Sequence, residues 1–78
     1  MARARLEFTV EPFVDGQPGP HVRAAIAAAE TAGLAVEMGP FGSVAEGDEA
    51  DIVEAVSRLL SAGLANGATR ITFEVRRS

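Results

Sequence analysis

Hydroxyl and carboxylate side chains alternate with apolar residues in several short stretches of this 78-residue chain. A hydroxyl can donate a hydrogen bond to a ring nitrogen, and hydroxyl and carboxylate oxygens can both accept one from an amino group. An aromatic side chain in a neighbouring loop, Phe41 or Phe13, could stack on a flat heterocycle. We therefore predict a ligand-binding site made of Thr9, Glu11, Glu37, Phe41, Ser43 and Thr72.

The same residues have simpler explanations, which the pattern leaves open. Alternating Thr and Glu are ordinary solvent-facing residues of a strand, and paired side chains of these types also stabilise neighbouring strands. Phe13 and Phe41 could equally be apolar contacts of a subunit interface, where aromatic residues are enriched.

Catalytic and metal-binding sites are not predicted. His21 is the only histidine, and no partner nucleophile or acid can be nominated for it, so it is interpreted as a surface residue. The absence of cysteine excludes a thiolate metal site and a cysteine nucleophile. The acidic run 48–54 lacks the ligand spacing and fixed glycine of a calcium loop, and helix capping explains it better. We therefore predict a protein that is not an enzyme and has no metal and no cofactor apart from its ligand.

Four strands are predicted to carry the candidate site. Residues 4–10 alternate between apolar and polar types, and this period of two is typical of a half-buried strand. Similar alternation predicts strands over residues 34–38 and 70–76. A turn at 39–42 precedes a short strand over residues 43–46, which Gly47-Asp48 is predicted to end.

Two helices are predicted between these strands. The first begins at Pro20, because proline suits the first helical position, and ends at Gly33, where a left-handed cap is expected. The second begins after Asp48, a good N-cap residue, and ends at Asn66-Gly67. Its predicted buried face consists of Ile52, Val53, Val56, Leu59, Leu60 and Leu64.

The resulting βαββαβ order predicts an α+β, ferredoxin-like sandwich. Right-handed crossovers place both helices on one face of a four-stranded antiparallel sheet of strand order 4-1-3-2. The end of the first strand then lies beside the starts of the third and fourth strands, so we expect Thr9, Glu11, Ser43 and Thr72 to meet. Strand parity assigns to the open face Glu7, Thr9, Glu11, Ala35, Glu37, Ser43, Ala45, Arg70, Thr72, Glu74 and Arg76.

Composition narrows the possible partners and location. A net charge of −4 and seven scattered arginines with no lysine argue against nucleic acid. No apolar run approaches the roughly 20 residues that span a bilayer, so we expect no membrane contact and a cytoplasmic protein. We expect residues 1–78 to form one domain. Because so short a domain is only marginally stable alone, we also expect a homodimer or homotetramer.

The hairpin that follows Gly33-Leu34 resembles the YkoF-like thiamine-binding family. Short members of that family carry Gly-Leu before the second strand and then a Gly-Pro-x-x-Ser/Thr-x-x-Glu-Gly hairpin. The matching residues here are Gly39, Pro40, Ser43, Glu46 and Gly47. The resemblance implies a non-catalytic cytoplasmic protein that binds thiamine or its hydroxymethylpyrimidine moiety and self-associates through its sheets. It favours Ser43 as a ligand contact, and Glu11 and Glu37 would suit a cation.

The alternative is a structural or regulatory protein-interaction domain with no small-molecule ligand. Other uses of this fold fit less well. An acylphosphatase-like enzyme needs an arginine in the first loop, which has none. RNA recognition needs aromatic residues on the open face, whereas Phe8 and Phe73 are predicted to face the helices.

Overall fold

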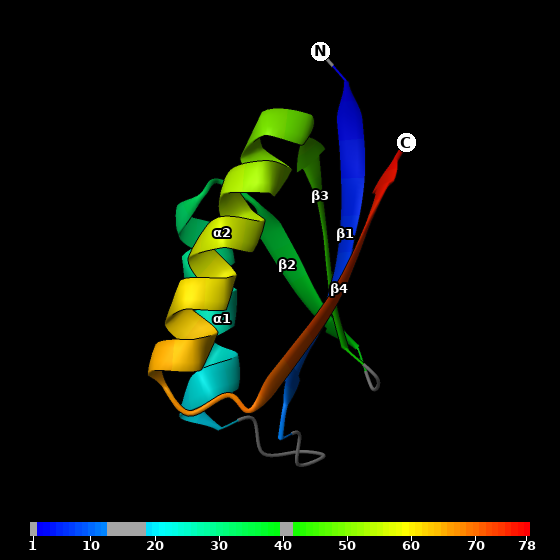
Figure 1. The fold of residues 1–78 in the computed structure, drawn as a ribbon. Coiled ribbons are helices and arrows are strands. Elements are labelled where there is room, and N and C mark those ends of the chain that lie inside the picture. Colours follow the sequence, from blue (N-terminus) through cyan, green and yellow to red (C-terminus); the bar gives the residue numbers. More distant parts are fainter. Residues whose placement is uncertain (1, 13–18, 40–41) are drawn as a thin grey trace.

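The computed structural model describes residues 2–12, 19–39 and 42–78. Within them the chain follows the predicted βαββαβ order (Figure 1). The elements are β1 (Arg3–Glu11), α1 (Pro20–Thr31), β2 (Ala35–Gly39), β3 (Gly42–Asp48), α2 (Glu49–Ala65) and β4 (Arg70–Arg77). None of the described helices is long and apolar enough to cross a membrane.

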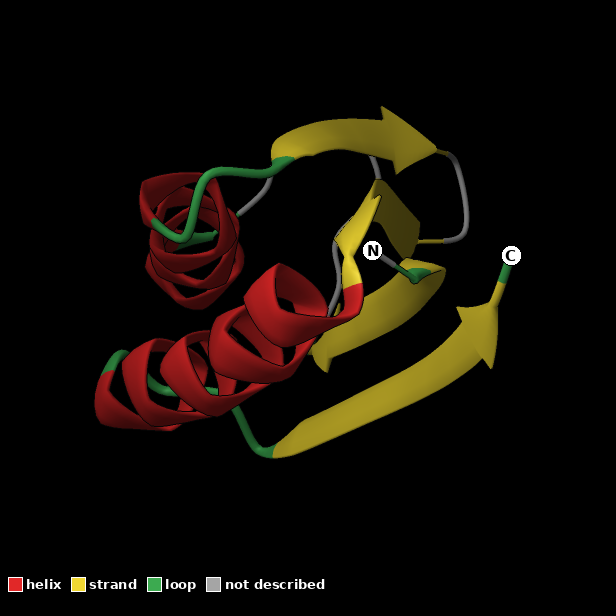
Figure 2. Ribbon diagram, turned by 90° about the horizontal axis from the view of Figure 1, so that it is seen from above, coloured by secondary structure: helices red, strands yellow, loops and turns green. Residues whose placement is uncertain are grey.

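The four strands form one antiparallel sheet in the order β2-β3-β1-β4, as predicted. Both helices lie against one face of this sheet, and no described element covers the other face (Figure 2). The fold is therefore a ferredoxin-like α+β sandwich with one open sheet face. β1 occupies a central position, since it pairs with β3 on one side and with β4 on the other.

The core lies between the helices and the covered face of the sheet. Alternate residues of β1 enter it, and among them Leu6 is fully buried, as are Ile52 and Leu59 of α2. Each such side chain contributes about 1.5–3 kcal/mol through removal from water. α1 contributes Val22, Ala25 and Ala29. Small side chains on both helices let them approach the sheet and each other closely.

The predicted helix boundaries are confirmed with one difference. Pro20 is the first residue of α1, and Gly33, just past its end, has a φ of 95°, the left-handed region that favours glycine. Asp48 is the N-cap of α2 but forms no side-chain capping hydrogen bond. Its carboxylate lies 3.7 Å from a guanidinium nitrogen of Arg3 instead. β3 spans Gly42–Asp48, so the prediction that Gly47-Asp48 ends a strand of residues 43–46 is wrong.

The predicted buried face of α2 is wrong for two residues. Val53 and Leu64 are 69% and 59% exposed, whereas Ala55 and Gly63 are buried. At Gly63 a Cβ would lie only 2.8 Å from Cδ1 of Ile71 on β4. The helix therefore turns its smallest residues toward the sheet where the two elements are closest, and larger side chains beside them point outward.

The parity predicted for β3 is also wrong. Ala45 lies opposite Leu6 and Ser43 lies opposite Phe8, and directly opposed residues of antiparallel strands share a face. Ser43 and Ala45 therefore face the helices, where they are 5% and 2% exposed. The hairpin is the physical reason: Gly39 pairs with Gly42, so Ser43 takes the face of its partner Met38 and not that of Glu37.

Candidate functional site

Strand register arranges the open-face residues in rows that cross the sheet. In one row Glu37 lies opposite Val44, Val44 opposite Glu7, and Glu7 opposite Glu74. We call Glu37, Val44, Glu7 and Glu74 the carboxylate row. Three of its four side chains are acidic, and they come from β2, β1 and β4.

The next row toward the hairpin carries hydroxyl groups and glycines. Thr9 of β1 lies opposite Thr72 of β4, and Gly39 of β2 lies opposite Gly42 of β3. We call Gly39, Gly42, Thr9 and Thr72 the hydroxyl row. β1 joins the two rows, because Glu7 and Thr9 are alternate residues of this strand and so share a face.

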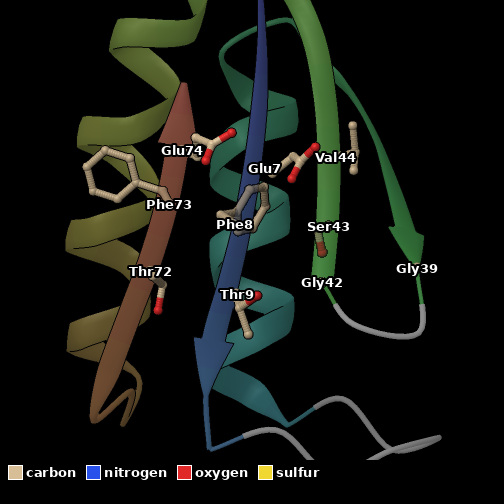
Figure 3. Close-up of a pocket in the computed structure, with 10 residues that line it drawn as sticks. All are labelled: Glu7, Phe8, Thr9, Gly39, Gly42, Ser43, Val44, Thr72, Phe73 and Glu74. Carbon is tan, nitrogen blue, oxygen red and sulfur yellow. The ribbon is translucent and has the colours of Figure 1, made fainter. Parts of the chain in front are cut away.

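An open hollow of about 470 Å³ lies over these two rows (Figure 3). Its lining includes Glu7, Val44 and Glu74 of the carboxylate row and all four residues of the hydroxyl row. Phe8, Ser43 and Phe73 complete the lining. These three residues lie opposite one another in the register, in a row whose side chains belong to the helix-facing side of the sheet. The ring of Phe73 projects from β4 away from β1 (Figure 3).

Gly42 lies at one side of the hollow, where its backbone is close to β1. A Cβ at this position would lie 2.8 Å from Oγ1 of Thr9 and 3.0 Å from the carbonyl oxygen of Phe8. The first separation is shorter than Cβ contacts in proteins, and the second lies at their lower limit, to a backbone atom that cannot move aside easily. Glycine is therefore needed here for close approach of β1 and β3.

Charge in the hollow is dominated by Glu7 and Glu74. The two carboxylates face each other directly across β1 and β4, an arrangement that like charges disfavour. Each has an arginine two residues away on its own strand, at 3.4 Å for Arg5–Glu7 and 3.3 Å for Arg76–Glu74. All four side chains are at least 44% exposed, so each ion pair contributes only about 0.2–1 kcal/mol.

The predicted site residues are only partly brought together. Thr9 and Thr72 meet in the hollow. Glu37 lies in the carboxylate row but outside the hollow. Glu11 lies opposite Arg70, 3.5 Å from its Nε, beyond the hydroxyl row.

Two predicted aromatic contacts are not tested, and the predicted face of one hydroxyl residue is wrong. Phe41 lies outside the described residues, as does Phe13. The prediction that Ser43 joins Thr9 on the open face is wrong, because Ser43 lies opposite Phe8 on the helix-facing side.

Sequence reasoning left several hollow residues out of the site. Glu7 and Glu74 were assigned to the open face but not to the site, and Val44 was assigned to the wrong face. A signal for Val44 was present in the hairpin. With two residues between them, Gly39 and Gly42 pair directly, and this pairing places Val44 opposite Glu37 on the open face.

The described residues offer no second candidate centre for chemistry. His21 lies in the first turn of α1, where its Nε2 contacts the carbonyl oxygen of Pro12. No cluster of three or more potential metal ligands occurs among residues 2–12, 19–39 and 42–78. The open-face hollow is therefore the candidate site.

Comparison with known families gives a match over nearly the whole chain. Residues 6–77 match the model of a family described as thiamine-binding protein. No curated protein sequence matches the chain.

Solved structures share the fold. A hypothetical protein of Methanocaldococcus jannaschii is 26% identical, with a TM-score of 0.72 over 100% of this chain and 80% of that one. A domain of unknown function from Bacillus cereus is 21% identical, with a TM-score of 0.69 over 97% and 74% of the two chains. A candidate thiamine biosynthesis or salvage protein of Thermotoga maritima is 19% identical, with a TM-score of 0.56 over 97% and 82%. At such identities the last two similarities concern the fold alone.

Proposed function

Because this chain belongs to the thiamine-binding protein family, we propose that it binds thiamine, or the hydroxymethylpyrimidine moiety of thiamine, in the open-face hollow. The ligand leaves unchanged, since the family is one of binding proteins. One observation carries the proposal of this site: Glu7 and Glu74 face each other beside the facing hydroxyl groups of Thr9 and Thr72.

The chemistry of thiamine suits these groups. Its thiazolium ring is a cation, which the two carboxylates attract. Its aminopyrimidine ring carries an amino group that a carboxylate or hydroxyl oxygen can accept from, and ring nitrogens to which a threonine hydroxyl can donate. Glu37, one strand away in the same row, and Glu11, beyond Thr9, add negative charge nearby.

Exposed charge pairs of this kind do not give tight binding by themselves, because each contributes about 0.2–1 kcal/mol. Most of the affinity then has to come from removing the rings from water. We therefore propose that a second copy of the chain covers the open face, in a homodimer or homotetramer that binds its ligand in the cytoplasm. A light-scattering mass of one chain at micromolar concentration, with thiamine present, would contradict this assembly.

Calorimetric titration with thiamine tests the site. The double variant Glu7→Gln/Glu74→Gln removes both charges and keeps the side-chain shapes. Losing two exposed charge contacts predicts about 2- to 30-fold weaker binding. The matched control is Glu30→Gln/Glu54→Gln, which makes the same charge change on the exposed surfaces of α1 and α2. Wild-type protein that gives no binding heat and no rise in melting temperature, or a hollow variant that binds as the control does, would refute the proposal.

A protein-interaction domain without a ligand is the second candidate function. Phe73 and Val75 of the edge strand β4 favour it, since they are 44% and 45% exposed although they lie on the helix-facing side of the sheet. A stable complex with another protein, together with no thiamine binding, would support this function over the first.

A further inference from the structure

Two arginine side chains face each other on the open face, in the row next to the carboxylate row. Arg5 of β1 lies directly opposite Arg76 of β4, two residues along each strand from the facing pair Glu7 and Glu74. Charges are therefore sorted by row: two carboxylates face each other, and two guanidinium groups face each other beside them.

Fold stability alone does not explain this sorting. Like charges directly opposite each other on neighbouring strands are destabilising. Exchanging the residues at positions 74 and 76 would place a Glu opposite an Arg in both rows and would keep an ion pair within β4. The chain has the less favourable arrangement between β1 and β4, which places a facing pair of carboxylates beside a facing pair of guanidinium groups.

The two guanidinium groups keep donors for a ligand. Arg5 and Arg76 approach their carboxylates through Nε at 3.4 and 3.3 Å. Among the described residues no hydrogen bond joins either pair, whereas Arg58 donates to Glu54 at 2.8 Å on α2. An arginine has five N–H donors, and its planar group recognises phosphate through two parallel hydrogen bonds.

We propose that Arg5 and Arg76 form an anion subsite, so that the preferred ligand carries a phosphate group as well as a cationic ring. This inference rests on the proposed function and specifies its ligand. The two rows are separated by two residues, or about 6.6 Å along a strand. Such a spacing suits thiamine monophosphate, in which a two-carbon chain joins the phosphate ester to the cationic ring. The ring lies over Glu7 and Glu74, and the phosphate reaches the two arginines.

Glu46, the neighbour of Arg5 on β3, directs the phosphate toward β4. Glu46 of β3 lies opposite Arg5 on the open face, so a phosphate is repelled on that side. Arg76 attracts it on the other side. The anion is thus expected between β1 and β4, in line with the facing carboxylates that hold the ring.

Parallel titrations with thiamine and thiamine monophosphate, at one ionic strength, test the subsite. Two exposed ion pairs predict that the wild-type protein binds the phosphate ester about 2- to 30-fold more tightly. In Arg5→Gln/Arg76→Gln the preference should disappear, while thiamine itself binds at least as well as before. The control Arg23→Gln/Arg58→Gln makes the same charge change on the helices and should keep the preference. Circular dichroism melts show that each variant is folded.

The outcomes separate this inference from the proposed function. Thiamine binding without any preference for the phosphate ester overturns the anion subsite and leaves the proposed function standing. A preference that survives in Arg5→Gln/Arg76→Gln also overturns it. Binding of the ester that depends on both arginines supports it, even where thiamine alone binds too weakly to measure. Failure of both ligands to bind refutes the subsite and the proposed function together.

Discussion

Glutamine placed at either of two neighbouring positions of β3 tests which side of that strand faces the helices. Ala45 is 2% exposed and lies opposite Leu6, a fully buried core residue. Val44 lies opposite Glu7 on the open face, where it lines the hollow. The variants Ala45→Gln and Val44→Gln introduce the same uncharged side chain one residue apart, so they differ mainly in the face it enters.

We expect Ala45→Gln to lower the free energy of unfolding severalfold more than Val44→Gln does. At position 45 the buried amide loses its hydrogen bonds to water, at about 1–3 kcal/mol, and its extra atoms overpack the core at about 1–3 kcal/mol. Ala45→Gln should therefore lower the free energy of unfolding by about 2–6 kcal/mol. A domain of this length has about 4–12 kcal/mol in total. Val44→Gln replaces a β-branched residue on the open face and should cost about 1 kcal/mol or less.

Urea unfolding followed by circular dichroism gives both free energies by linear extrapolation. The parity of β3 is refuted if Val44→Gln is as destabilising as Ala45→Gln. The same proteins can be titrated with thiamine, and there the order should reverse. Val44→Gln changes the lining of the hollow and should alter the affinity, whereas any folded Ala45→Gln protein should bind as the wild type does.

Two further predictions concern the hairpin and the end of β4. Gly42→Ala should lower the free energy of unfolding by about 1–3 kcal/mol in urea, because its Cβ would meet the backbone carbonyl of Phe8 at 3.0 Å. Gly39→Ala, with its nearest contact at 3.3 Å, should cost less, and equal costs would contradict this reasoning. The hydrogen bond that Arg77 donates to Glu49 raises the pKa of the arginine in the folded protein. This interaction is therefore fully stabilising below the pKa of Arg77 in the unfolded chain, and its effect is lost only as the pH rises through the higher pKa of the folded state. Because both values are strongly alkaline, Arg77→Gln should leave the slope of unfolding free energy against pH unchanged between about pH 6 and 9.

The fold could be predicted because the strongest patterns lie in the strands that make most of the sheet. In β1, Leu6, Phe8 and Val10 alternate with polar residues, and β4 repeats the pattern with Ile71, Phe73 and Val75. The shared period assigns matching faces to the two strands, and the ferredoxin-like topology makes them neighbours. Pro20 and Gly33 similarly bound α1 by backbone geometry alone.

β3 could not be predicted from its own residues, because hydrophobicity does not distinguish its faces. Ser43, Ala45 and Gly47 are small because the space beneath the helix layer is small: a Cβ at position 47 would lie 2.5 Å from Cδ2 of Leu34. Val44, the most apolar residue of the strand, lies on the open face instead. Packing volume selected these residues, and the sequence pattern alone does not reveal packing volume.

The wrong parity of β3 affected only part of the predicted site. Thr9 and Thr72 meet because their positions depend only on the β1–β4 pairing, which alternation predicts well. Ser43 was misplaced because its position depends on the parity of β3. The paired carboxylates Glu7 and Glu74 were overlooked for a different reason: their significance lies in the register between strands, which residue types in a single strand do not show.

Packing volume limits the residues on the helix-facing side of the sheet, whereas the charges on the open side are less constrained by stability. On the helix-facing side each residue is limited by volume, and replacement costs stability. On the open side, exposed ion pairs contribute little, so many charge arrangements would fold equally well. The sheet nevertheless carries facing carboxylates beside facing arginines, an arrangement that stability disfavours. The proposed ligand, with a cation and an anion spaced like these two pairs, accounts for that arrangement.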